Sequence, residues 1–134
     1  MLLRLTPAFG GDGTVLGIIA MNDTGSDLLT LFTTDLPLLG NSQGYIGWMG
    51  PMSVIDASGT TTVFPMIFVQ VRPVRDDNTP WGNWIDEDAI VKQPGLGLSR
   101  LSGVGIRRHL YIGTAPGNNR LAVATTKGGL YSLL

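Results

Sequence analysis

The segment Asp23-Thr24-Gly25-Ser26 contains the residues of this 134-residue chain whose types and spacing best suit chemistry. The Asp23 carboxylate can hold and deprotonate a water molecule, which is the task of a general base. The Thr24 hydroxyl can fix the loop through hydrogen bonds to the backbone, and Gly25 lets the chain turn tightly beside a bound molecule. The segment therefore predicts a rigid loop that presents one reactive carboxylate.

Short apolar segments, often β-branched and bounded by Gly, Pro, Asn or Asp, surround this loop, as strands require. They predict strands at residues 2–6, 15–21, 28–32, 52–55, 60–71, 89–91, 121–125 and 130–134. The 19 glycines and 8 prolines also favour short strands and many turns over long helices. Only residues 104–110 have the spacing of a short helix. The chain is predicted to be mainly β and to form a single domain over residues 1–134.

Two tight turns are predicted between strands, one at residues 9–13 and one at Asp56, Ala57, Ser58 and Gly59. Gly59 adopts a positive φ at little steric cost, which suits a hairpin. Pro65 cannot donate a ladder hydrogen bond, so the strand at 60–71 should be bent, bulged or at an edge there.

The order of these elements resembles that of the retropepsins, the single-domain aspartic proteases of retroviruses and retrotransposons, and most closely their retrotransposon-derived relatives in cellular genomes. The resemblance rests on Asp23-Thr24-Gly25-Ser26 after a strand, on the hairpin some thirty residues later, and on Gly103 before the short helix. It implies a closed β-barrel with a flap hairpin and one short C-terminal helix. Asp23, Thr24, Gly25 and Ser26 would form the catalytic loop.

The same resemblance implies a homodimer that cuts polypeptides. The reaction needs two carboxylates that share one proton, whereas this chain has one Asp-Thr-Gly, so Asp23 would meet its copy on a two-fold axis. The terminal strands at 2–6 and 121–134 would form the interface. A Ser26 hydroxyl bonded to the carboxylate would stabilise its charged form, which predicts activity at acidic pH.

Substrate contacts are implied for Asp27 and for the flap tip. The tip comprises Asp56, Ala57, Ser58, Gly59 and Thr60. Two positions depart from the pattern of the family. Asn22 replaces an apolar residue, and Val104 replaces the charged residue that would pair with Asp27; Arg107, Arg108 or Arg4 are the available substitutes.

Composition excludes several other classes of protein. The absence of cysteine excludes disulfides and thiol chemistry, and the single histidine, His109, leaves little basis for a zinc site or a Ser-His triad. Nine basic against ten acidic residues argue against a nucleic-acid partner. No apolar run is long enough to span a membrane. We expect an intracellular, cytoplasmic location and neither cofactor nor metal; Asp86-Glu87-Asp88 reads as a solvated acidic edge with only Asp86 and Asp88 on one face.

The prediction is therefore an aspartic endopeptidase that acts as a homodimer. Two alternatives stay open at this point. The first is a catalytically inactive dimerisation or peptide-binding module of the same fold, which the departures at Asn22 and Val104 motivate. The second is a β-sandwich scaffold in which the Asp23 segment is only a turn.

Overall fold

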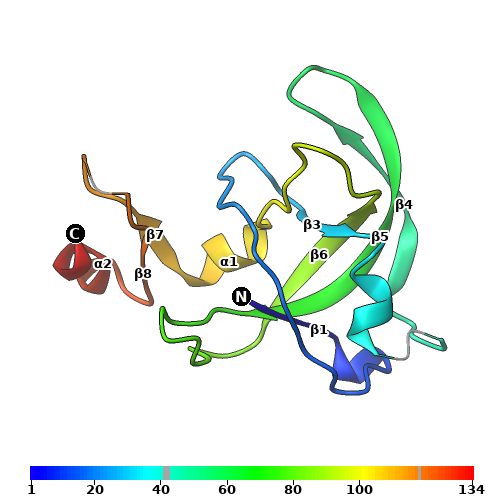
Figure 1. The fold of residues 1–134 in the computed structure, drawn as a ribbon, viewed down its shortest axis with the longest axis horizontal. Helices are drawn as coiled ribbons and strands as arrows, with labels where there is room; N and C mark the ends of the chain where they lie inside the picture. The colour runs from blue at the N-terminus through cyan, green and yellow to red at the C-terminus, as the bar shows by residue number, and fades with distance from the viewer. Residues whose placement is uncertain (41–42, 118) are drawn as a thin grey trace.

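The computed structural model describes residues 1–40, 43–117 and 119–134 and is mainly β, as predicted (Figure 1). Its strands are β1 (Leu2–Leu5), β2 (Leu16–Gly17), β3 (Leu29–Phe32), β4 (Trp48–Ile55), β5 (Thr61–Arg72), β6 (Ile85–Lys92), β7 (Tyr111–Gly113) and β8 (Ala122–Ala124). Two 3-10 turns, η1 (Pro7–Phe9) and η2 (Leu36–Leu39), and two helices, α1 (Val104–His109) and α2 (Lys127–Leu133), complete the chain. The short helix predicted at 104–110 is confirmed.

Six strands form one sheet in the order β2-β1-β5-β6-β3, and β4 also pairs with β5. Every pair is antiparallel except β3 with β6, which is parallel. In the part of the chain that the structure describes, no pairing joins β2 to β3, so the ladder of hydrogen bonds has two ends. The closed barrel that the family resemblance implies is not formed by these pairings.

The core lies on one face of this sheet, where the inward residues of β1, β3 and β5 meet. The side chains that are completely or almost completely buried there are Leu3, Leu5, Leu29, Leu31, Leu39, Ile67, Val69 and Val71. From Ile67 onward, the buried Ile67, Val69 and Val71 of β5 alternate with half-buried residues, which is the period-two pattern of a strand with one covered face.

Strands β4 and β5 form the hairpin that the sequence predicts around Gly59. Asp56 N–H donates to the Thr60 carbonyl over 3.0 Å, and Gly59 takes the positive φ of 83° that the turn requires. The expected irregularity near Pro65 is also confirmed, because the register of β4 shifts by one residue opposite it, between Met49 and Met52. Figure 1 shows the hairpin projecting beyond the rest of the sheet.

The outer edge of β3 is covered by the segment just before α1. Thr30 N–H donates to the Leu101 carbonyl over 3.0 Å, and Leu101 forms a parallel bridge with Met21. Met21 and β3 therefore flank residues 100–102 from two sides. Because the Asp23 segment connects Met21 to β3, this arrangement fixes both ends of that segment.

The C-terminal part differs from the prediction. Residues 130–134 were expected to form a strand, but Lys127–Leu133 is the helix α2, capped by the Thr126 side chain, which accepts a hydrogen bond from Gly129 N–H over 3.0 Å. The buried Leu130 side chain lies near Gly113 of β7. Helix α2 therefore packs against the β7–β8 pair through Leu130. Figure 1 shows β7, β8 and α2 set apart from the six-stranded sheet.

The N-terminal strand also lies elsewhere than the resemblance implies. Strand β1 pairs with β2 on one side and with β5 on the other, so both its edges are used inside the sheet. Its edge toward β5 is occupied over all of Leu2–Leu5, and its edge toward β2 is occupied at Leu2 and Leu3. Among the described residues, no helix is long and apolar enough to cross a membrane.

Candidate functional site

The Asp23 loop is a compact turn held largely by its own backbone. Gly25 N–H donates to Asp23 Oδ1 over 2.9 Å, and Ser26 N–H approaches the Asp23 carbonyl at 3.3 Å. Asp23 is half-buried, while Thr24 and Gly25 are exposed. The carboxylate is therefore fixed by one backbone donor and remains open to solvent at the surface of the molecule.

The side chains of Thr24 and Ser26 do not act as the sequence suggests. Ser26 Oγ donates to the Leu28 carbonyl over 2.7 Å, so its single proton is not directed at the Asp23 carboxylate. The expected bond between these two side chains is absent, and the argument from Ser26 for acidic activity loses its basis. The Thr24 hydroxyl makes no hydrogen bond within residues 1–40, 43–117 and 119–134, so the loop is locked without it.

A second set of contacts ties the loop to the region before and within α1. Ser102 Oγ accepts a hydrogen bond from Asp23 N–H over 3.2 Å, and Val104 N–H approaches the Asp27 carbonyl at 3.3 Å. The loop is thus attached at Asp23 and at Asp27 to the segment that leads into the helix. Gly103, which the sequence analysis places before the short helix, lies between Ser102 and Val104, which make these two contacts.

Arg107 has a role that sequence reasoning did not find. Its guanidinium donates through Nη1 to the Asp23 carbonyl over 2.6 Å and through Nη2 to the Ser26 carbonyl. Arg107 was one of three candidates for a partner of Asp27, but it binds the backbone of the loop instead. Another candidate, Arg4, donates to Gln70 and lies over the Trp84 ring. The Asp27 side chain is exposed.

The helix that carries Arg107 is held by a buried carboxylate. Glu87 is only 3% exposed, and its two oxygens accept hydrogen bonds from Gly105 N–H over 3.1 Å and from Ile106 N–H over 2.9 Å. Burial raises the pKa of Glu87, and the two backbone bonds together with the Arg107 charge oppose part of that rise. The carboxylate thus satisfies two N–H groups that the first turn of a helix leaves free.

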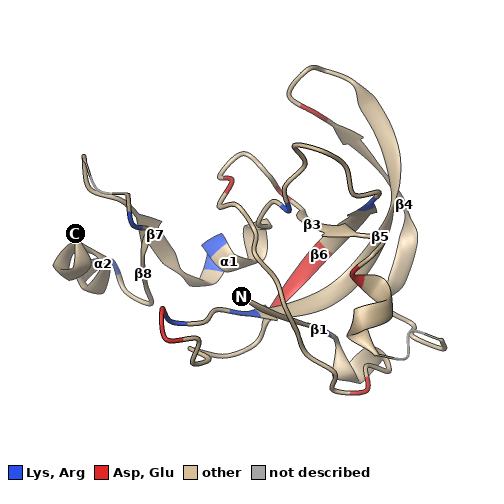
Figure 2. Ribbon diagram, viewed as in Figure 1, with Lys and Arg blue, Asp and Glu red and all other residues tan. Residues whose placement is uncertain are grey.

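The prediction of a solvated acidic edge on β6 is correct for Asp86 and Asp88 and wrong for Glu87, which is buried. Asp86 and Asp88 are exposed on one face, whereas Glu87 points inward to α1. Figure 2 shows acidic residues on β6 and basic residues on α1, with charges of both signs scattered over the rest of the ribbon. Within the described part of the chain, no group of three or more His, Cys, Asp or Glu residues is placed to hold a metal ion.

The hairpin tip is organised around one carboxylate oxygen. Asp56 Oδ1 accepts hydrogen bonds from Ser58 Oγ at 2.5 Å, from Ser58 N–H at 2.9 Å and from Thr60 N–H at 3.0 Å. The bonds from the Ser58 hydroxyl and the Thr60 backbone lower the pKa of Asp56. Asp56 thus gives the tip, Ala57 and Gly59 included, a defined shape although all five residues are exposed.

This geometry predicts a pH-dependent hairpin tip. A lowered pKa means that the bonds of Asp56 hold above that pKa and are lost as the pH falls through it. The amide NMR shifts of Ser58 and Thr60 should therefore titrate together, with a midpoint below the ordinary Asp value of about 4. In the matched control Asp56→Asn this step should disappear. A midpoint at or above the ordinary value would contradict the arrangement.

Asn22 marks the entry to the loop with an unusual feature. Its Oδ1 atom is buried and has no hydrogen-bond partner within the described residues. A buried acceptor of this kind is destabilising by about 1–3 kcal/mol. The departure from the family pattern at Asn22 therefore coincides with a local imperfection directly beside Asp23.

An ion pair supports the same region from outside the loop. Arg100 donates to both carboxylate oxygens of Asp35, through Nε at 2.9 Å and through Nη2 at 2.6 Å, and its guanidinium lies over the Phe32 ring. Burial by itself raises the pKa of Asp35, but the bonds from Arg100 and from Phe32 N–H outweigh it, so this pKa lies below its usual value. The pair fixes residues 100–102 against the end of β3.

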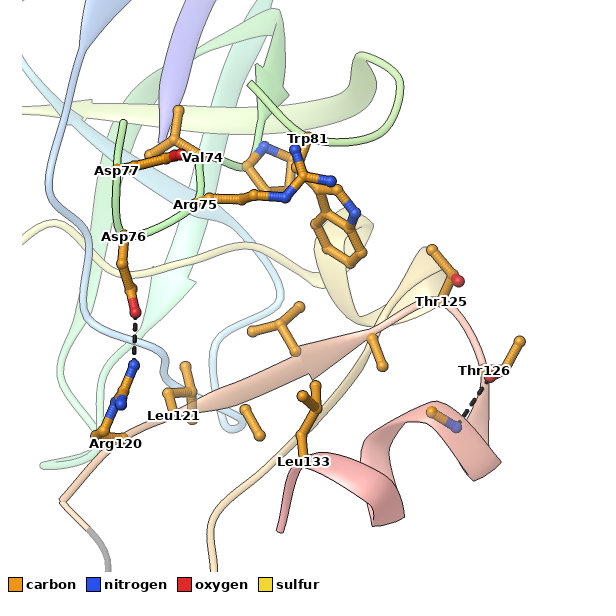
Figure 3. Close-up of a pocket in the computed structure, with 15 residues that line it drawn as sticks. Val74, Arg75, Asp76, Asp77, Trp81, Arg120, Leu121, Thr125, Thr126 and Leu133 are labelled. Carbon is orange, nitrogen blue, oxygen red and sulfur yellow. Dashed lines mark hydrogen bonds and ion pairs between the residues drawn. The ribbon is translucent and has the colours of Figure 1, made fainter. Parts of the chain in front are cut away.

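Two cavities of the described part of the chain lie away from the Asp23 loop. One cavity of about 940 Å³ lies between residues 73–81 and the C-terminal elements β8 and α2. Figure 3 shows Trp81 and Arg75 on one side of it and Leu121 and Leu133 on the other, with Asp76 and Arg120 paired at 2.6 Å at the rim. A smaller one, of about 300 Å³, lies beside Met21 and Arg100. Neither of these two cavities is lined by a residue of the Asp23 loop.

The structure brings Asp23, Thr24, Gly25, Ser26 and Asp27 together in one loop and places the hairpin tip on a separate element. No hydrogen bond joins the loop to the tip in the described part of the chain. In comparisons with known proteins, no family model, no curated protein and no solved structure matches this chain.

Proposed function

We propose that the chain is an aspartic endopeptidase of the retropepsin type that acts as a homodimer. We keep acidic pH as part of the proposal for a reason that does not involve Ser26, namely that one of the two paired carboxylates must stay protonated. In this proposal two Asp23 carboxylates share one proton. The ionised one deprotonates a water molecule, and the protonated one gives its proton to the oxygen of the scissile carbonyl. Asp27 and the tip residues Asp56–Thr60 would hold the substrate backbone in an extended form.

The observation that carries the proposal is the fixed position of the Asp23 loop. The loop is attached to Ser102, to Val104 and to Arg107, so three residues of one other segment hold residues 23–27 in place. A carboxylate that must meet its copy on a symmetry axis needs such preorganisation, because a small displacement of a reacting group lowers the catalytic rate strongly. An ordinary surface turn needs none of these contacts, which speaks against the scaffold alternative.

The flap part of the proposal rests on the hairpin. Figure 1 shows its tip and the loop before β3 on the same side of the view. A hairpin that closes over a substrate excludes water and adds backbone hydrogen bonds to it. The barrel would be open between β2 and β3, in contrast to the closed barrel of the family.

The dimer in this proposal uses the C-terminal part, since β1 is occupied. Tyr111 is 47%, Leu121 51% and Leu133 60% exposed, and the last two line the cavity of about 940 Å³. Large apolar side chains gathered in this way mark an interaction surface. Because a single chain supplies one Asp-Thr-Gly, the occupant that completes the site is a second copy.

This surface yields a prediction for Leu133. A charge placed at the centre of an apolar interface must be desolvated, so Leu133→Asp should weaken the dimer about tenfold or more. Sedimentation velocity over a range of concentrations measures this, and cleavage should fall in proportion to the lost dimer. The control is Ile46→Asp, at an apolar position that is 75% exposed and far from β8 and α2 in the sequence. An unchanged dimer in Leu133→Asp would assign the interface elsewhere.

The direct test is cleavage of a peptide library at acidic pH, with and without a transition-state analogue of aspartic proteases. The proposal predicts cleavage that the analogue blocks and that rises with the square of concentration where the dimer dissociates. Cleavage that the analogue leaves unchanged, or the absence of cleavage by a verified dimer, would overturn it.

Two observations favour a second candidate, a catalytically inactive module that binds peptides or dimerises. Asn22 leaves a buried oxygen without a partner, and the Asp27 side chain is not held by Arg107. Both positions lie in the loop that catalysis would need to keep rigid. A dimer that binds peptides in the hairpin without cutting them would select this candidate.

A further inference from the structure

The back of the Asp23 loop contacts α1, which joins the loop to the sheet through Arg107 and Glu87. We infer that Arg107 is a positioning residue which holds the loop in its working shape, and that Glu87 is the anchor that fixes the helix carrying Arg107. The inference concerns the geometry of the loop; only its activity readout rests on the proposed function.

The first step is the contact of Arg107 with the loop. One guanidinium binds the carbonyls of Asp23 and Ser26, which are the first and last residues of the four-residue turn. A planar guanidinium with two parallel donors sets the distance and the direction of both acceptors at once. Arg107 therefore defines the width of the turn from which the Asp23 carboxylate projects.

The second step is the contact of Glu87 with the helix. The carboxylate accepts from two consecutive N–H groups, at Gly105 and Ile106, immediately before Arg107. A helix of six residues has little stability of its own, so it depends on such external contacts. The position of the Arg107 backbone is thus set by a residue of β6, in the middle of the sheet.

Two glycines leave the space that this arrangement needs. A Cβ at Gly103 would overlap the Glu87 carboxylate and lie 2.9 Å from Leu29 N, and a Cβ at Gly105 would lie 2.6 Å from Glu87 Cδ. Real Cβ atoms do not approach other heavy atoms so closely, hence any other residue at these positions would displace Glu87. The Gly103 turn before the helix therefore serves to admit the carboxylate.

Charges around Glu87 are consistent with this role. Burial is the main cause that raises the pKa of Glu87; the bonds from Ile106 and Gly105 N–H lower it, and so does the Arg107 charge, while the Asp88 charge raises it. The charges of Glu87 and Arg107 attract each other, so each favours the position of the other. Among these neighbours, Arg107 is the group that reaches the loop.

The test compares Arg107→Ala and Arg107→Lys with the control Arg108→Ala, an exposed arginine on the same helix. In folded Arg107→Ala dimer, kcat should fall about 100-fold. KM should change by less than about threefold, because a displaced loop alters the reacting geometry more than substrate binding. Arg107→Lys should restore part of kcat, and Arg108→Ala should match the parent. Equal kcat in parent and Arg107→Ala would overturn the inference.

A second readout does not depend on activity. Hydrogen exchange of the Gly25 and Ser26 amides should accelerate about tenfold in Arg107→Ala, because both amides are bonded within the turn that Arg107 holds. The same acceleration should occur in Glu87→Gln, whose side chain can accept from only one of the two helix N–H groups. In the double variant the effects should be less than additive. Parent-like exchange in the single variants would overturn the inference.

The two readouts keep this inference distinct from the proposed function. If the parent protein cleaves no peptide, the proposed function fails, while faster hydrogen exchange in Arg107→Ala still supports the positioning role of Arg107. If the parent cleaves and Arg107→Ala is parent-like in both kcat and exchange, the positioning role fails and the protease assignment stands.

Discussion

Asp23→Asn is expected to reduce peptide cleavage by about 10²–10⁴-fold, the contribution of a well-placed general acid or base. In the proposed dimer the substitution removes both carboxylates at once, since each chain supplies one. An asparagine side chain can neither take a proton from water nor give one to the scissile carbonyl. The loss should therefore appear in kcat, with KM largely unchanged.

The fold should tolerate this substitution. The Asp23 side chain accepts one hydrogen bond, from Gly25 N–H at 2.9 Å, and the Asn oxygen can accept the same bond. The contacts of Ser102 and Arg107 are made to the Asp23 backbone, so they do not depend on its side chain. Thermal unfolding and the dimer dissociation constant should consequently stay close to those of the parent.

The control for this prediction is Asp88→Asn, which removes an exposed carboxylate of β6 and should leave cleavage unchanged. An Asp23→Asn protein that is folded, dimeric and as active as the parent would exclude the aspartic protease mechanism. A monomeric but active parent would exclude it as well, because a lone Asp-Thr-Gly lacks the second carboxylate.

The parts of the fold that follow from short-range chemistry were predictable. The hairpin around Gly59 needs a positive φ and a carboxylate two residues before Ser58, and both are visible in the sequence. The helix at 104–109 follows from its apolar spacing. The Asp23 segment was predictable for the same reason, since a turn between two apolar strands is a local property.

The supports of the loop were not predictable, because their partners are far apart in the sequence. Glu87 meets Gly105 and Ile106 across 18 and 19 positions, and Arg107 meets Asp23 across 84. Strand alternation separates Glu87 from its two exposed neighbours, but it does not indicate the distant helix that Glu87 binds. The glycines at 103 and 105 were the available signal, since two glycines beside a helix start can mark a close approach of another side chain.

The error at the C-terminus has a local cause. The sequence predicts strands at residues 121–125 and 130–134, on either side of Gly128-Gly129, yet Thr126 caps a helix through Gly129 N–H. Leu130 and Leu133 are three residues apart, which is a helical spacing as well as a strand-like apolar run. In such short apolar segments the spacing of the apolar residues does not distinguish a helix from a strand. Here the packing of Leu130 on β7 and β8 favours the helix.

Asp35→Ala is expected to give the largest loss of stability, about 3 kcal/mol at neutral pH, because it leaves half of a buried ion pair uncompensated. The Asp35 side chain is 4% exposed, and it accepts two bonds from Arg100 and one from Phe32 N–H. Urea unfolding of the parent and the variant measures the difference. The matched control is Asp76→Ala, since the Asp76–Arg120 pair has the same 2.6 Å distance but is exposed on both sides. It should change stability by less than about 1 kcal/mol.

The pH dependence of this effect separates the ion pair from simple loss of packing. Because the folded protein lowers the pKa of Asp35, its contribution is present above the ordinary Asp value of about 4 and is lost as the pH falls through the folded value. The titration of Glu87 changes the stability with pH in the opposite direction. Its raised pKa gives a contribution that is present below about 4.3 and is lost as the pH rises through the folded value. The free energy of unfolding of Asp35→Ala should therefore lack the part of the decline at acidic pH that Asp35 causes in the parent, while the contribution of Glu87 is the same in both. The two curves of stability against pH should converge at low pH. Curves that stay parallel down to pH 3 would show that the Arg100 pair does not supply the stability assigned to it.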